Sequence, residues 1–184
     1  MKNRDILWIV LTVLIILCAA FCGCIEEKPP KYAKPSETVQ ETSASEQQLK
    51  LLKKVTHGEV WTFTKNWDED AEDDGIAVYI TLKDANDKTV KFEDVSLPVE
   101  IEIYTEEWKD GNPAKGRLVY KGTATITSWE YGNPFLSGGI RISFEDIKTT
   151  ETDPKWGIIY VKVHLPDGRI IEAKEDFGVR IKPK

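Results

Sequence analysis

Apolar and polar residues alternate with a period of two through most of the chain after Gly58. Successive side chains of a β-strand point to opposite faces, so this pattern predicts strands with one buried and one wet face. Helical segments of the βαβ type do not separate the runs. The sequence therefore predicts an all-β domain, an antiparallel two-sheet sandwich, with strands at residues 61–63, 76–82, 99–103, 118–126, 140–144, 159–165 and 171–181.

Turn-forming residues separate the predicted strands. Residues 166–168 (Pro-Asp-Gly) predict a tight hairpin turn, because Gly168 can adopt a positive φ. Residues 84–87 and 110–113 are expected to form longer surface loops, and Gly122 predicts a bulge within its strand. The residues of the last run expected to face the core are Ile171, Ala173, Phe177, Val179 and Ile181.

The first 25 residues have the composition of an export signal. Lys2 and Arg4 precede an apolar run over residues 6–21, and a small residue, Gly23, precedes Cys24. Two interpretations are open. Cleavage before Cys24 would leave a thiol that can be lipidated, or residues 6 to 25 would stay as a signal-anchor helix. The apolar run is shorter than the ~20 residues that span a bilayer comfortably, which favours residues 1–23 as a cleaved signal peptide and Cys24 as the lipid attachment site.

The cleavage region carries a family resemblance. Phe21-Cys22-Gly23-Cys24, followed by Ile25-Glu26, resembles the lipobox of prokaryotic lipoproteins, and its Gly-Cys-Ile-Glu junction resembles archaeal ones in particular. The resemblance implies a surface lipoprotein on the extracytoplasmic face of the cell membrane.

The segment between leader and domain divides into a tether and a short helix. Residues 24–45 are rich in Pro, Ser, Thr, Glu and Lys and are expected to form a disordered tether. Ser45 begins a capping box, and apolar residues then recur at helical spacing, so residues 46–57 predict a short amphipathic helix that Gly58 ends. Residues 58–184 remain as the β-sandwich domain.

Charge and cysteine usage exclude several classes of partner and chemistry. The net charge is −6, and it becomes −7 once Lys2, Arg4 and Asp5 leave with the first 23 residues. An acidic surface repels nucleic acid and anionic lipid headgroups. All three cysteines lie at residues 18, 22 and 24, so the domain has no disulfide, thiol nucleophile or thiolate metal site.

A second resemblance concerns the fold. Residues 153–163 (DPKWGIIYVKV) resemble the corner before a late strand of immunoglobulin-like domains. The resemblance implies an immunoglobulin-like sandwich in which Tyr160 folds back to bond the preceding turn.

The densest run of charge lies at residues 68–74, before the strand at residues 76–82. Asp70, Glu72 and Asp74 have the alternate spacing with which a tight loop offers carboxylate oxygens to calcium. An EF-hand would need a Glu at the position of Thr81, so that motif is excluded. A calcium site and a solvated acidic loop are both open, and calcium is the one cofactor that the sequence suggests.

Aromatic residues cluster in a loop with several glycines. Trp129, Tyr131 and Phe135 surround residues 132–134 (Gly-Asn-Pro). On a loop they could stack on a sugar ring or anchor a protein partner. They could equally cover the open end of the sandwich.

Candidates for catalysis are few. The chain has two histidines, His57 and His164, and Glu100 and Glu102 share one strand face, as a glycosidase pair could. Charges on a wet face explain these residues as well, and phosphate-binding or His-rich metal motifs do not occur. We therefore predict a non-catalytic binding or envelope-structural module, anchored to the membrane, with a protein or carbohydrate partner and no nucleic acid. The alternatives are a calcium-stabilised adhesion module, an accessory subunit of a membrane complex and, last, a hydrolase.

Overall fold

The computed structural model describes residues 38–183 apart from residues 69 and 176. One helix, α2 (Thr38–Leu52), precedes eight strands and a short 3₁₀ helix, η1 (Trp129–Gly132). The strands are β1 (Val55–Lys65), β2 (Gly75–Asp84), β3 (Leu97–Lys109), β4 (Asn112–Ile126), β5 (Ile140–Ser143), β6 (Trp156–His164), β7 (Ile170–Lys174) and β8 (Val179–Arg180). The predicted leader and Cys24 lie outside the described residues.

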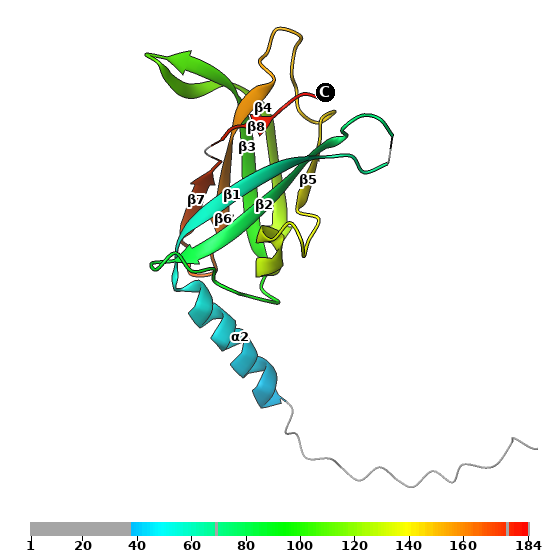
Figure 1. Ribbon diagram of the computed structural model, residues 1–184. Helices are drawn as coiled ribbons and strands as arrows, with labels where there is room; N and C mark the ends of the chain where they lie inside the picture. Colours follow the sequence, from blue (N-terminus) through cyan, green and yellow to red (C-terminus); the bar gives the residue numbers. More distant parts are fainter. Residues whose placement is uncertain (1–37, 69, 176, 184) are drawn as a thin grey trace, which may run out of the picture. The chain divides into compact units, whose positions relative to one another are not determined.

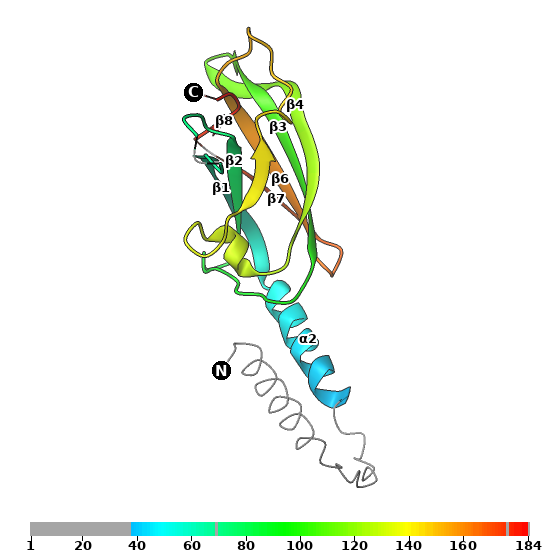
Figure 2. The ribbon, with the colours of Figure 1, turned by 90° about the vertical axis from the view of Figure 1, so that its right-hand side faces the viewer.

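The strands form two antiparallel sheets that face each other. The smaller sheet has the order β1-β2-β5, and the larger has the order β4-β3-β6-β7, with β8 also paired to β6. Figure 2 shows the two layers edge-on, with β1 and β2 on one side and β3, β4, β6 and β7 on the other. The predicted all-β sandwich is confirmed at this level.

The core fills the space between the sheets. Alternate residues of β3 (Val99, Ile101, Ile103) and of β6 (Ile159, Val161, Val163) are buried, and they contribute to one apolar cluster with residues of β2. Strand β2 is buried on both faces from Gly75 to Ile80, and η1 packs against its later part, where the Thr81 hydroxyl donates to the carbonyl of Gly132 at 3.2 Å (Figure 1). The sandwich contains no disulfide, because no cysteine follows Cys24.

Helix α2 differs in extent from the predicted helix. It begins at Thr38, so residues 38–45 of the predicted tether are helical, and it ends at Leu52, so residues 55–57 already belong to β1. Ser45 lies inside the helix and not at its N-terminus, where the predicted capping box would place it. The physical reason is that extending a formed helix through Ser and Thr costs only about 0.5 kcal/mol per residue, far less than starting one.

The helix ends against the domain and is fastened there by Arg169. Leu52 is buried in the core. The Arg169 guanidinium, from the turn between β6 and β7, donates to the carbonyls of Leu52, Lys53 and Val55 at 3.1, 3.2 and 2.6 Å. The Leu52 and Lys53 carbonyls lie at the C-terminus of the helix, where the last carbonyls have no partner within the helix, and Val55 is the first residue of β1.

Two of the predicted turns are tighter or more regular than expected. Residues 110–113 do not form a long loop: Asp110 and Gly111 both have positive φ and make a two-residue hairpin between β3 and β4. Gly122 is not in a bulge, since it pairs regularly with Ile101. Its missing side chain instead leaves space for the Tyr120 ring. The irregular register lies further along the hairpin, between Ile103 and Glu106.

The last predicted strand is interrupted. Strand β7 ends at Lys174 and β8 begins at Val179, and Gly178 between them has a φ of +80°. Phe177 was expected to face the core and is instead 80% exposed. The break turns its side chain outward, while Val179 and Ile181 return to the core.

Among residues 38–183, gaps excepted, the structure contains no helix of the length and apolar character that crossing a bilayer requires.

Candidate binding surface

Four exposed aromatic side chains follow one edge of the sandwich, where β1 runs beside β7 and β8. Trp61 and Phe63 are each 45% exposed, Trp156 at the start of β6 is 52% exposed, and Phe177 belongs to the break between β7 and β8. Large exposed apolar side chains that gather in one place mark interaction sites in soluble domains. We call Trp61, Phe63, Trp156 and Phe177, with the two hollows between them, the seam surface.

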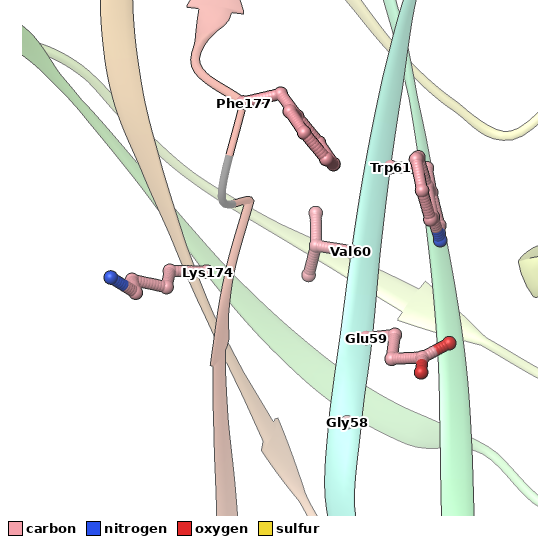
Figure 3. Close-up of a pocket in the computed structure, with 6 residues that line it drawn as sticks. All are labelled: Gly58, Glu59, Val60, Trp61, Lys174 and Phe177. Carbon is pink, nitrogen blue, oxygen red and sulfur yellow. The ribbon is translucent and has the colours of Figure 1, made fainter.

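The first hollow is drawn in Figure 3. Residues 58–61 of β1 line one side, and Lys174 and Phe177 line the other. The rings of Trp61 and Phe177 lie 6.0 Å apart between centroids, with 25° between their planes. The Lys174 side chain extends away from the rings. The two stacked rings thus give the hollow an aromatic wall.

The second hollow continues along β1. It has a volume of ≈ 210 Å³ and is lined by residues 62–64, Ile76, Trp156, Gly178 and Arg180. Phe63 lies edge-on against Tyr79 of β2, at 5.7 Å between centroids, which fixes its ring on the outer face of the smaller sheet. Arg180 donates from Nε to the carbonyl of Lys182 at 2.8 Å. This end of the seam surface therefore combines two aromatic rings with a cation.

Glu175 connects β1 to the break after β7, between the two hollows. This carboxylate is buried, and it accepts the backbone N–H of Thr62 at 3.2 Å and the hydroxyl of Thr62. Burial raises the pKa of Glu175, and the two hydrogen bonds from Thr62 oppose that rise. The side chain thus bridges the edge of β1 and the break after β7.

The predicted calcium ligands do not converge. Asp70 accepts the N–H of Glu72 at 2.7 Å, and the Asp74 carboxylate accepts the N–H of Trp67. The structure gathers no group of three or more potential metal ligands anywhere in the residues it describes, which do not include Glu69. The described carboxylates of this loop fold the loop onto itself.

The predicted aromatic cluster is divided. Trp129 and Tyr131 are half-buried and pack against the core, and Lys91 Nζ lies 4.4 Å from the centre of the Trp129 ring. Phe135 is 94% exposed. It lines a shallow hollow with Thr81, Thr89 and Trp129. Two of the three rings therefore cover the core, and one stands in solvent.

On the outer face of the larger sheet, the glutamates considered for catalysis form ion pairs. Glu102 accepts from Lys121 Nζ at 2.9 Å and from the Tyr104 hydroxyl at 2.8 Å. These hydrogen bonds, that from Lys121 first, lower the pKa of Glu102. A general acid needs a raised pKa, so this carboxylate is unsuited to that role. Glu100 pairs with His164 Nε2 at 2.8 Å.

The remaining candidates also have structural partners. His57 pairs with Asp87 at 3.0 Å on the surface. The Tyr160 ring lies against Tyr104 at 5.9 Å and beneath Lys115 Nζ at 3.6 Å. Within the described part of the chain, the Tyr160 hydroxyl makes no hydrogen bond to the preceding turn, so this residue does not form the predicted corner.

The seam surface was not predicted from the sequence. Trp61 and Phe63 are two residues apart and therefore share a strand face, which was the available signal. Their proximity to Trp156 and Phe177 depends on the folding of β1 beside β7 and β8, and on the outward turn of Phe177. Neither could be read from the alternation of the sequence.

Comparison of the chain with protein-family models, with curated proteins and with solved structures found no match.

Proposed function

We propose that the protein is a non-catalytic binding module held at the extracytoplasmic face of the cell membrane, and that it binds its partner through the seam surface. One observation carries the proposal. Six aromatic side chains are strongly exposed among the described residues, and four of them lie on this seam. Exposed aromatic clusters contribute disproportionately to binding.

The arrangement of strands supports a finer description of the fold. A sheet of the order β1-β2-β5 faces one of the order β4-β3-β6-β7, and the chain crosses between the sheets after β2, β4 and β5. Such crossings are typical of immunoglobulin-like sandwiches. We propose that this domain is one, with Tyr160 used on the outer face of the sheet and not in a corner.

Membrane attachment is supported by the sequence. The apolar run at residues 6–21, the junction before Cys24 and the polar composition of residues 24–37 are those of a lipoprotein leader and tether. The domain that follows is acidic, so we propose attachment by the N-terminus and not by contact of the domain with anionic lipid.

A binding assay tests the function directly. Envelope fragments from the source cells are incubated with the purified domain and sedimented. We expect the domain to sediment with them and the double variant W61A/W156A to stay in solution. The variant W108A is the matched control, because Trp108 is also strongly exposed but lies at the end of the β3–β4 hairpin. Equal sedimentation of the seam and control variants would overturn the proposal.

A mass measurement tests the anchor separately. The intact mass of the native protein should correspond to a chain that begins at Cys24 and carries lipid, and a C24S variant should accumulate unprocessed. A native product that retains residues 1–23 would favour the signal-anchor helix instead.

A further inference from the structure

Pairing of a partner strand with β1 would be the obvious use of a strand at a sheet edge. The structure blocks this use at two points. The N–H of Thr62 is already bonded to Glu175. At Gly58, β1 approaches β7 so closely that an added Cβ would lie 3.3 Å from Ile171 and 3.4 Å from Ala173. We therefore expect a ligand of the seam surface to bind without adding a strand to β1.

The size of the seam surface favours a narrow ligand over the face of a globular protein. Six residues line the first hollow and seven line the second. A stable protein interface uses about 20–30 residues on each side. The hollows follow one another along β1, with Phe177 beside the first and Gly178 beside the second. A linear chain of small rings fits this arrangement.

Charge restricts the ligand further. The chain without its first 23 residues carries a net charge of −7, so its field repels polyanions. Within this field, Arg180 holds an unusual position. The other arginines that the structure describes are Arg117, Arg141 and Arg169, and each has a carboxylate or an aromatic ring as partner. Among the described residues Arg180 has no carboxylate in ion-pair contact and no ring in cation–π contact, and its Nε donates to the carbonyl of Lys182.

We propose that the seam surface binds an uncharged sugar chain, an inference that rests on the function proposed above. One face of a pyranose ring presents C–H groups, and its rim presents hydroxyls. The C–H face can stack on the apolar rings of the seam surface, which are those of Trp156, Phe63 and the Trp61–Phe177 pair. The hydroxyls of the rim can accept hydrogen bonds from Arg180, which carries several N–H donors in one plane and lines the same hollow as Trp156 and Phe63.

The test measures affinity for defined sugars. The purified domain is titrated with neutral oligosaccharides, namely α- and β-linked glucose, mannose and galactose chains, and with polygalacturonate as the acidic probe. We expect at least one neutral chain to bind. W156A and R180Q should each weaken that binding at least about tenfold, as expected for residues at the centre of a binding site. W108A should leave it unchanged.

A second substitution separates hydrogen bonding from charge. R180K keeps the positive charge and loses the planar set of donors. We expect it to weaken neutral-sugar binding as R180Q does. Thermal unfolding of each variant shows whether it is folded, and W156A supports or overturns the proposal even if both Arg180 variants unfold.

Three results would overturn the proposal: no neutral chain binds, polygalacturonate binds more tightly than every neutral chain, or W156A binds as W108A does. The envelope assay distinguishes these results from failure of the proposed function. If protease treatment of the envelope abolishes sedimentation that depends on the seam, the partner is a protein. The binding function then stands, and the sugar proposal falls.

Discussion

Arg169 connects the turn between β6 and β7 to the point where α2 becomes β1, and its replacement by Met should destabilise the whole domain. The substitution keeps most of the aliphatic stem and removes the three hydrogen bonds to the carbonyls of Leu52, Lys53 and Val55. The Arg169 side chain is 41% exposed, so water replaces part of what is lost. At about 0.5–1.5 kcal/mol for each bond, the expected loss is about 2–4 kcal/mol.

This loss corresponds to a fall in Tm of roughly 5–15 °C for a domain of this size. Urea unfolding measures the free energy, and amide hydrogen exchange shows whether α2 loses protection before the strands do. R169K is the matched control, because one ammonium group cannot reach three carbonyls at once and should recover only part of the stability. A change in R169M below about 0.5 kcal/mol, with unchanged exchange in α2, would refute the assigned role.

Three further predictions concern other parts of the domain. Burial raises the pKa of Glu175 in the folded protein above its value in the unfolded chain. Protonated Glu175 therefore stabilises the fold at a pH below the unfolded pKa, and this stability is lost as the pH rises through the folded pKa. Urea unfolding from about pH 4 to about pH 8 should show a weaker decline in E175Q than in the wild type, and parallel declines would contradict this reasoning. G75A should lower the free energy of unfolding by several kcal/mol in the same assay, because its Cβ would overlap the carbonyl oxygen of Ile142. G111A is the control: φ is positive there but the space is open, so the loss should be about 1 kcal/mol. Equal losses in the two variants would contradict the role of close packing at Gly75. Millimolar calcium should leave Tm unchanged relative to chelator, because Asp74 is occupied by a backbone N–H, and a clear rise would restore the calcium site.

The fold was predictable from the sequence to the extent that it depends on local alternation. Six of the predicted runs coincide with β1 to β6, because a period of two is imposed by the strand itself. The last run failed at Phe177, since its break depends on Glu175 meeting Thr62 of a distant strand. The predicted start of the helix was also wrong, because the extension of a helix that is anchored at one end leaves only weak signals in the sequence.

The candidate site was far less predictable. Trp129 and Phe135 are six residues apart in one loop, yet one packs on the core and the other stands in solvent. Trp61 and Phe177 are distant in sequence, yet they lie ring against ring. Adjacency in the chain was therefore a poor guide to adjacency on the surface, because a sandwich brings together strands that the chain visits far apart.

The contact between Glu175 and Thr62 has a consequence for crowded surroundings. At high local concentration, an outer strand with open amides can recruit a strand of a neighbouring copy into a growing aggregate. Glu175 occupies the Thr62 amide in the middle of β1, on the side away from β2. Association of two copies through β1 should consequently be disfavoured, even though a row of aromatic rings lies beside that strand.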